Sequence, residues 1–176
     1  ALEDRFRDIS VQAVYSSDLS RAQETAQAIA LPKNLELHPD PAFREIHLGE
    51  LTNIPYGDFT YHHPDLYKSF FSFSPHWAPK GGETFQQVAN RIAPAFFRIA
   101  AAHPGESVAI FSHAMAIHCL QAAIRGKHPS EVKELPLGEN TAVSCYEIQG
   151  DRFRILFEND ASHLTEELTS AKQRST

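Results

Sequence analysis

Arg21 is a cation at a place where the sequence predicts the start of a helix. The stretch "VYSSDLSRAQETAQAIA" runs from an apolar segment through two serines into a helical pattern, and Arg21 lies in its first turn. The macrodipole disfavours a cation there, but a bound anion would offset this, because helix N-termini also bind anions. The pattern predicts an anion-binding arginine. The alternative is an ion pair with Asp18 or Glu24 on a solvated face.

His113 is a second candidate, in "VAIFSHAMAIHCL". It follows a continuous apolar run and precedes another helical pattern. Ligands of open α/β sheets bind beyond the carboxyl ends of the strands, so a histidine at this point is a candidate pocket or catalytic residue. The alternative is a histidine whose polar atoms are satisfied within the core.

The stretch "FREIHLGE" combines Arg44, Glu45, His47 and Glu50 after a short predicted strand. A glutamate beside a phosphate can act as a general acid where burial and a nearby anion raise its pKa. Glu45 is therefore a candidate proton donor. The alternative is a charge cluster on the surface.

The elements that position these residues alternate between strand and helix patterns, which predicts a three-layer α/β sandwich. The run at 107–113 is typical of a central strand covered on both faces. A long, mostly irregular excursion at 38–82 is typical of a binding loop or lid, with a surface insertion as the alternative. Helices are expected at 2–9, 19–30, 84–102 and 114–126, with one more near 56–70 and a helical turn at 130–133. Strands are expected at 11–16, 35–37 and 107–113. A hairpin is expected from strands at 141–148 and 152–158, with its turn at Gly150 and Asp151.

Composition indicates one globular domain over 1–176, with a polar, flexible tail at 165–176. Of the 176 residues, 42% are hydrophobic and 22% charged. The net charge of −6, with no basic block, argues against nucleic acid or an anionic membrane as partner. A small anionic substrate remains possible, since a local pocket can be basic. The oligomeric state is left open.

Cysteine and histidine usage bears on location and metals. The two cysteines, Cys119 and Cys145, lie in apolar patterns and are expected to be buried free thiols, which favours a cytoplasmic protein. No stretch approaches the roughly 18–20 apolar residues that span a bilayer. Among the ten histidines, His62 and His63 are adjacent and point different ways, so neither a metal site nor a cofactor is expected.

Four motifs occur in one order along the chain: "YSSDLSRAQETA", "FREIHLGE", "GGETFQQVANRI" and "VAIFSHAMAIHCL". Together with "ENTAVSCYEI" and "NDASHL", this series resembles the histidine phosphatase superfamily, also called phosphoglycerate-mutase-like, over about residues 2–164. The resemblance implies an α/β/α sandwich on a mostly parallel sheet. It also implies metal-independent phosphoryl transfer through a phosphohistidine.

The resemblance assigns roles to the candidate residues. It implies that Arg21 binds phosphate, that Glu45 protonates the leaving oxygen, and that His113 is the second pocket histidine on the phosphoryl oxygens. The family usually has glycine after that histidine, whereas this chain has Ala114, whose methyl group can crowd the phosphate. Phosphoryl transfer needs such positive groups, an in-line nucleophile and an acid.

The chain departs from the family at its start. The family's nucleophilic histidine belongs to an Arg-His-Gly motif, which occurs nowhere in these residues, and the first residues match the helix that follows it. The first strand and the nucleophile are therefore expected to precede residue 1, and the 176 residues alone are expected not to turn over a phosphohistidine.

Two functions follow from these observations. The short interval between Glu45 and Gly81 favours a phosphatase over a mutase, acting on a small phosphorylated metabolite or binding inorganic phosphate. A non-catalytic phosphoester-binding or regulatory module is the alternative. Aromatic residues of the excursion are expected to form an apolar cap over the substrate: Tyr56, Phe59, Tyr61, Phe70, Phe71, Phe73 and Trp77.

Overall fold

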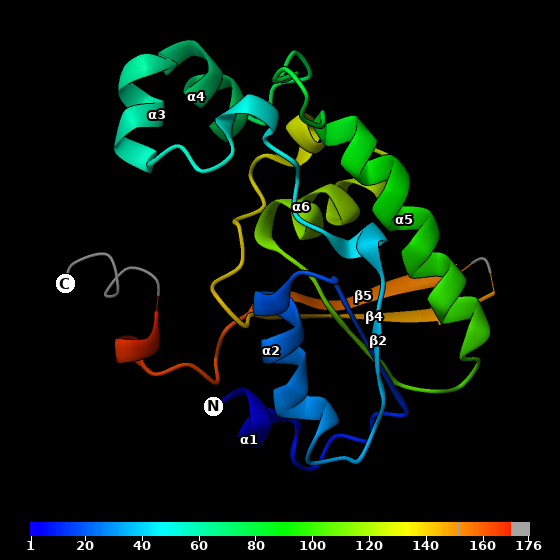
Figure 1. The fold of residues 1–176 in the computed structure, drawn as a ribbon. Helices are drawn as coiled ribbons and strands as arrows, with labels where there is room; N and C mark the ends of the chain where they lie inside the picture. Colours follow the sequence, from blue (N-terminus) through cyan, green and yellow to red (C-terminus); the bar gives the residue numbers. More distant parts are fainter. Residues whose placement is uncertain (151, 170–176) are drawn as a thin grey trace. The chain divides into compact units, whose positions relative to one another are not determined.

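The structure, a computed structural model, describes residues 1–150 and 152–169 (Figure 1). Its contacts divide the chain into two compact units, and each is described by itself. The first unit contains Ala1–Pro41, Phe97–Phe111 and the chain from Pro136; the second contains Ala42–Phe96 and Ser112–Leu135.

A parallel three-stranded sheet lies at the centre of the first unit. Strand β1 (Ala13–Ser16) pairs with β2 (Leu37–Pro39) on one side and with β3 (Val108–Phe111) on the other. Val14 of β1 is fully buried, because it packs against the helices that flank the strand in sequence. Those helices are α1 (Leu2–Phe6) and α2 (Ser20–Ala30), which contribute Leu2, Ala26, Ile29 and Ala30 to the same core.

Strand β3 differs from the prediction of a central strand covered on both faces. Within the described residues the sheet order is β2-β1-β3, so β3 lies at an edge. All four of its residues are only half-buried, whereas three of the four in β1 are buried. An apolar run reports burial but not pairing on both sides, which is why the sequence pointed to the centre of the sheet.

The predicted hairpin is present in the first unit. Strand β4 (Val143–Gln149) pairs antiparallel with β5 (Arg152–Asp160). Gly150 has a φ of +56°, which glycine adopts without strain at a tight turn. Asp151, the other predicted turn residue, lies outside the described residues.

The second unit is helical. It contains α3 (Tyr56–His62) and α4 (Pro64–Phe71), which contact each other, and α6 (Ala114–Ala123) (Figure 1). The first part of α5 (Phe85–Ala102) also belongs here. Short 3-10 helices complete it: η1 at Pro41–Phe43, whose first residue ends the first unit, η2 at Gly49–Leu51 and η3 at Pro129–Val132.

Four aromatic residues of the excursion pack into a core. Trp77 is fully buried, and its ring lies 4.8 Å from that of Phe70. Phe70 stacks on Phe85 of α5, with ring centroids 5.7 Å apart. Phe59 and Phe73 are buried too, whereas Tyr61 is 82% exposed. These four rings are therefore covered mainly by protein, whereas Phe71 is half-buried, and the cap over a substrate stays a prediction. The side chain of Tyr56 lies outside the described part.

Element bounds differ from the predictions where backbone chemistry intervenes. The helix expected near 56–70 is two helices, because Pro64 starts a new one at its N1 position. Helix α5 matches the predicted 84–102 to within one residue and continues through Pro94, whereas α6 ends at Ala123, three residues before the predicted Gly126. The predicted tail is outside the described residues from 170 onward, after η4 (Glu166–Leu168). None of the described helices is long and apolar enough to cross a membrane.

Candidate functional site

Glu45 binds the N-terminus of helix α6. Its carboxylate accepts the backbone N–H of Met115 at 3.2 Å and of Ala116 at 3.0 Å, and also that of its neighbour Ile46 at 2.9 Å. The first amides of a helix have no partner within the helix. His113, the N-cap residue, makes no side-chain capping bond, so Glu45 supplies the cap from elsewhere in the chain. The negative carboxylate also complements the positive end of the α6 dipole.

His113 and Ala114 lie at the same end of α6. His113 is 9% exposed, and its carbonyl accepts the N–H of Ile117 at 2.8 Å as the helix begins. Ala114 is the first helical residue, and it is exposed. One residue before His113, the Ser112 hydroxyl donates to the carbonyl of Phe43 at 2.8 Å. The start of α6 is thus bound both to Glu45 and to the segment that precedes Glu45.

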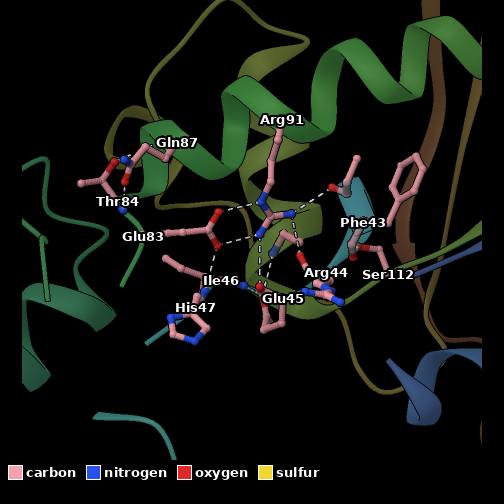
Figure 2. A network of polar contacts seen from close by, with 12 residues as sticks. Phe43, Arg44, Glu45, Ile46, His47, Glu83, Thr84, Gln87, Arg91 and Ser112 are labelled. Carbon is pink, nitrogen blue, oxygen red and sulfur yellow. Dashed lines mark hydrogen bonds and ion pairs between the residues drawn. The ribbon is translucent and has the colours of Figure 1, made fainter. Parts of the chain in front are cut away.

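Arg91 holds the segment that carries Glu45, as Figure 2 shows. Its Nη1 donates to the carbonyls of Ala42 at 2.9 Å and Arg44 at 2.8 Å, and its Nη2 donates to the carbonyl of Glu45 at 3.1 Å. The same guanidinium forms a two-pronged ion pair with Glu83, with both N–O distances at 2.8 Å. Residues 44–48 belong to no helix or strand and lack the backbone hydrogen bonds of such an element. The bonds from Arg91 hold this segment in their place.

Glu83 connects the "GGET" and "FREIHLGE" motifs. Its carboxylate accepts the backbone N–H of His47 at 2.9 Å, and its own N–H donates to the His47 carbonyl at 2.8 Å. Burial would raise the pKa of Glu83, but the bonds from Arg91 and from the His47 N–H outweigh burial and lower it. Glu83 is therefore an ionised partner for Arg91 at neutral pH.

A capping box fixes the start of helix α5, the helix that carries Arg91. The Thr84 N–H donates to the Gln87 side chain at 2.8 Å, and the Gln87 N–H donates to the Thr84 hydroxyl at 3.1 Å (Figure 2). This reciprocal pair satisfies two orphan amides of the helix start.

Two glycines let the motif backbones approach each other. A Cβ on Gly49, whose φ is +60°, would lie 2.2 Å from the Lys80 carbonyl oxygen. A Cβ on Gly82 would lie 2.6 Å from the His47 carbonyl oxygen. The Lys80 carbonyl accepts the N–H of Glu50 and the His47 carbonyl accepts that of Glu83, so a shift of either oxygen would break a hydrogen bond. Glycine therefore fits both positions without strain.

Arg21 belongs to the first unit, whereas Glu45, His113 and Ala114 belong to the second. It is the second residue of α2 and is exposed, as predicted for the first turn. Its carbonyl accepts the Thr25 hydroxyl at 2.9 Å. Within the described residues its guanidinium pairs with neither Asp18 nor Glu24, so the alternative ion pair is not formed.

Both cysteines are free thiols, as expected. Cys119 on α6 is fully buried, and burial, with the Glu45 charge adding to it, raises the pKa of its thiol to about 12. It is therefore protonated at neutral pH and cannot act as a thiolate nucleophile. Cys145 is only half-buried, in contrast to the prediction. In the part of the chain that is described, no three His, Cys, Asp or Glu side chains gather as metal ligands.

Sequence reasoning missed Glu83 and Arg91 as part of the site. Both lie in "GGETFQQVANRI", and their opposite charges flank the start of a predicted helix. That charge pair was the available signal, but the bonds of Arg91 to 42, 44 and 45 could not be inferred from it.

Known proteins match most of the chain. The family model of the histidine phosphatase superfamily (branch 1) matches residues 1–161. Phosphoglycerate mutase-like protein 4 of Arabidopsis thaliana is 34% identical over 163 residues, covering 91% of this chain and 69% of its own length. The metal-independent phosphoserine phosphatase of the same plant is 32% identical over 158 residues, covering 87% of this chain and 63% of its own length.

A solved structure supports the same comparison. YhfR of Bacillus stearothermophilus is 30% identical and superimposes with a TM-score of 0.85, covering 92% of this chain and 80% of YhfR. The match confirms the α/β fold class predicted from the sequence.

Proposed function

Because this chain belongs to the histidine phosphatase superfamily (branch 1), we propose that it carries the phosphate-binding and proton-donor residues of a phosphomonoester hydrolase. Membership confirms the resemblance of the motifs. The observation that carries the proposal is the Glu45 carboxylate bound to the N-terminal amides of α6, two and three residues after His113. This arrangement supports an acid and a phosphate ligand acting at one helix end.

The proposed reaction has two steps. In the first, a nucleophilic histidine attacks phosphorus, the P–O bond to the leaving group breaks as a P–N bond forms, and Glu45 protonates the leaving oxygen. In the second, Glu45 takes a proton from water, which displaces the histidine and releases inorganic phosphate. Arg21 and His113 stabilise the charge on the phosphoryl oxygens. No Arg-His-Gly occurs in these 176 residues, so this reaction is proposed for a protein that joins them to such a histidine.

The ionisation of Glu45 constrains this role. Three backbone N–H donors stabilise its carboxylate anion. A phosphate dianion close to Glu45 would act in the opposite direction and favour the protonated form.

Ala114 is proposed to contact the phosphate at the start of α6. Its side chain is exposed, so it is accessible to a ligand. Its methyl group narrows the approach by comparison with glycine, which predicts weaker phosphate binding than in a glycine variant at the same position.

The proposed substrate is a small phosphorylated metabolite, hydrolysed without a metal or other cofactor. The name of one relative, a metal-independent phosphoserine phosphatase, supports metal independence for this chain too. The net charge of −6 argues against nucleic acid and anionic membranes as partners.

A second function, non-catalytic binding of phosphoesters, is favoured by one observation. Ala114 stands where the family usually has glycine, and its methyl group can crowd the phosphate. Such a module would bind phosphate and not release it from an ester. The two functions therefore differ in turnover and not in binding.

The test uses the native protein, with its intact mass measured first. Hydrolysis of p-nitrophenyl phosphate is followed with and without EDTA, and vanadate binding is measured by calorimetry. Turnover that EDTA leaves unchanged and that Glu45→Gln reduces supports the phosphatase. Vanadate binding without turnover supports the binding module. Failure of both turnover and binding contradicts both functions.

A further inference from the structure

We propose that Arg91, anchored by Glu83, is a positioning residue that sets the orientation of the Glu45 carboxylate. The proposal rests on the role proposed for Glu45 in the reaction, but its geometric part can be tested without turnover. Arg91 itself is not proposed to touch substrate.

Each N–H donor of the Arg91 guanidinium has a hydrogen-bond acceptor. Arginine carries five N–H donors in a fixed plane. Here Nε and one Nη2 N–H bind the Glu83 carboxylate, both Nη1 donors bind the carbonyls of Ala42 and Arg44, and the second Nη2 N–H binds the carbonyl of Glu45. Because every donor is used, a small rotation of the plane would break several bonds at once.

The bonded carbonyls fix the backbone on both sides of Glu45. The Arg44 carbonyl belongs to the peptide before the Glu45 Cα, and the Glu45 carbonyl belongs to the peptide after it. Holding both peptides fixes φ and ψ of Glu45, and thereby the direction in which its side chain leaves the backbone. The carboxylate at the far end of that side chain is the group that binds Met115 and Ala116.

Glu83 fixes the guanidinium in turn. The ion pair is three-quarters shielded from water, with side-chain exposures of 23% for Arg91 and 25% for Glu83. Glu83 also accepts the N–H of His47, two residues beyond Glu45, so it holds the same segment directly. Lysine could keep the charge of Arg91, but a single ammonium group cannot reproduce this planar fork.

The test measures amide hydrogen exchange by NMR in Arg91→Lys and Glu83→Gln. We expect the amides of Met115 and Ala116 to exchange about tenfold faster in both variants, since each loses about one net hydrogen bond of stability. The amide of Ile117, which donates to the His113 carbonyl in the helix itself, should stay protected. Arg98→Lys is the matched control, because Arg98 lies on the same helix and its exposed guanidinium pairs with Asp40, outside the unit that contains the Glu45 segment.

A coupling experiment separates positioning from a general structural role. In a Glu45→Ala background, Arg91→Lys should no longer change the exchange of Met115 and Ala116, because the acceptor is gone. A merely structural role would raise exchange along all of α6 in both backgrounds. In the native protein, Arg91→Lys should lower kcat and leave KM unchanged.

Unchanged exchange at Met115 and Ala116 in a folded Arg91→Lys or Glu83→Gln protein would overturn the inference. Faster exchange in a protein that shows no turnover would leave the positioning intact and contradict the phosphatase proposal instead. Glu83→Gln preserves the shape of the side chain while it removes the charge that fixes the Arg91 guanidinium, so it is the gentler of the two variants if Arg91→Lys does not fold.

Discussion

The carboxylate of Glu45 accepts the backbone N–H of Ala116 at 3.0 Å, across 71 residues of sequence. A side chain from a stretch without regular structure thus caps a distant helix. Glu45→Ala should lower the free energy of unfolding by about 1–2 kcal/mol, the usual cost of losing an N-cap acceptor. Urea denaturation measures this cost. Glu50→Ala is the control, since Glu50 is exposed; equal losses in the two variants would contradict the capping role.

The close approach of the motif backbones gives a second prediction. Gly82→Ala should destabilise the protein, because the added Cβ would meet the His47 carbonyl oxygen at 2.6 Å. A Cβ on Gly57, within α3, meets nothing within 4 Å. Alanine there should instead stabilise the helix by up to about 1 kcal/mol. Melting temperatures of the two variants on the same side of the wild type would contradict this reading.

The burial of His118 should make the free energy of unfolding depend on pH. It is 1% exposed on α6, its ring stacks on Phe73 at 3.9 Å, and its Nε2 donates to the Pro129 carbonyl at 3.3 Å. Its buried Nδ1 has no hydrogen-bond partner among the described residues. Burial lowers the pKa of His118 below its usual 6.5. Protonation would place a charge and an unpaired N–H in the core.

The unfolded chain therefore binds a proton at His118 below about pH 6.5, whereas the folded chain stays neutral until a lower pH. The stability that neutral His118 contributes is fully present above about pH 6.5. It falls by up to about 1.4 kcal/mol per pH unit as the pH drops from there toward the pKa of His118 in the folded protein. His118→Gln should flatten this decline in urea titrations between pH 5 and 8. His62→Gln, at an exposed position, should not. Identical slopes for wild type and His118→Gln would refute the assignment.

The thiol of Cys119 should be unreactive in the folded protein. Its buried side chain and its pKa of about 12 leave almost no thiolate at neutral pH. Mass spectrometry after iodoacetamide treatment at pH 7.5 should find Cys119 unlabelled in the native protein and labelled in urea. Cys145 is half-buried and should label faster than Cys119. Rapid native labelling of Cys119 would show that α6 is less well packed than the structure indicates.

Local patterns predicted local structure well. The apolar run before Ser16 and the alanine-rich helical spacing after Ser20 are sufficient to place β1 and α2, because both depend on neighbours in sequence. Within the described residues β3 lies at a sheet edge, which was not predictable, since an apolar run does not reveal how many strands pair with it. The aromatic residues around Trp77 suggested a substrate cap because composition does not distinguish a core from a lid.

The site was predicted only in part for the same reason. Glu45 and His113 were candidates by motif and by position after a strand, and their roles stay predictions. The binding of Glu45 to α6, and the five bonds of Arg91, join residues that lie 8 to 71 positions apart. Contacts at such separations depend on the folded chain and leave no local periodicity in the sequence.

The central claim, that this chain holds a phosphate pocket, is tested most directly through Arg21. Calorimetric titration of the native protein with vanadate should show binding that Arg21→Ala weakens by about 10- to 100-fold or more, the cost of losing charge-assisted hydrogen bonds. Arg7→Ala, at an exposed arginine of the same unit, should bind as the wild type does. Near-normal vanadate affinity in Arg21→Ala would contradict the account.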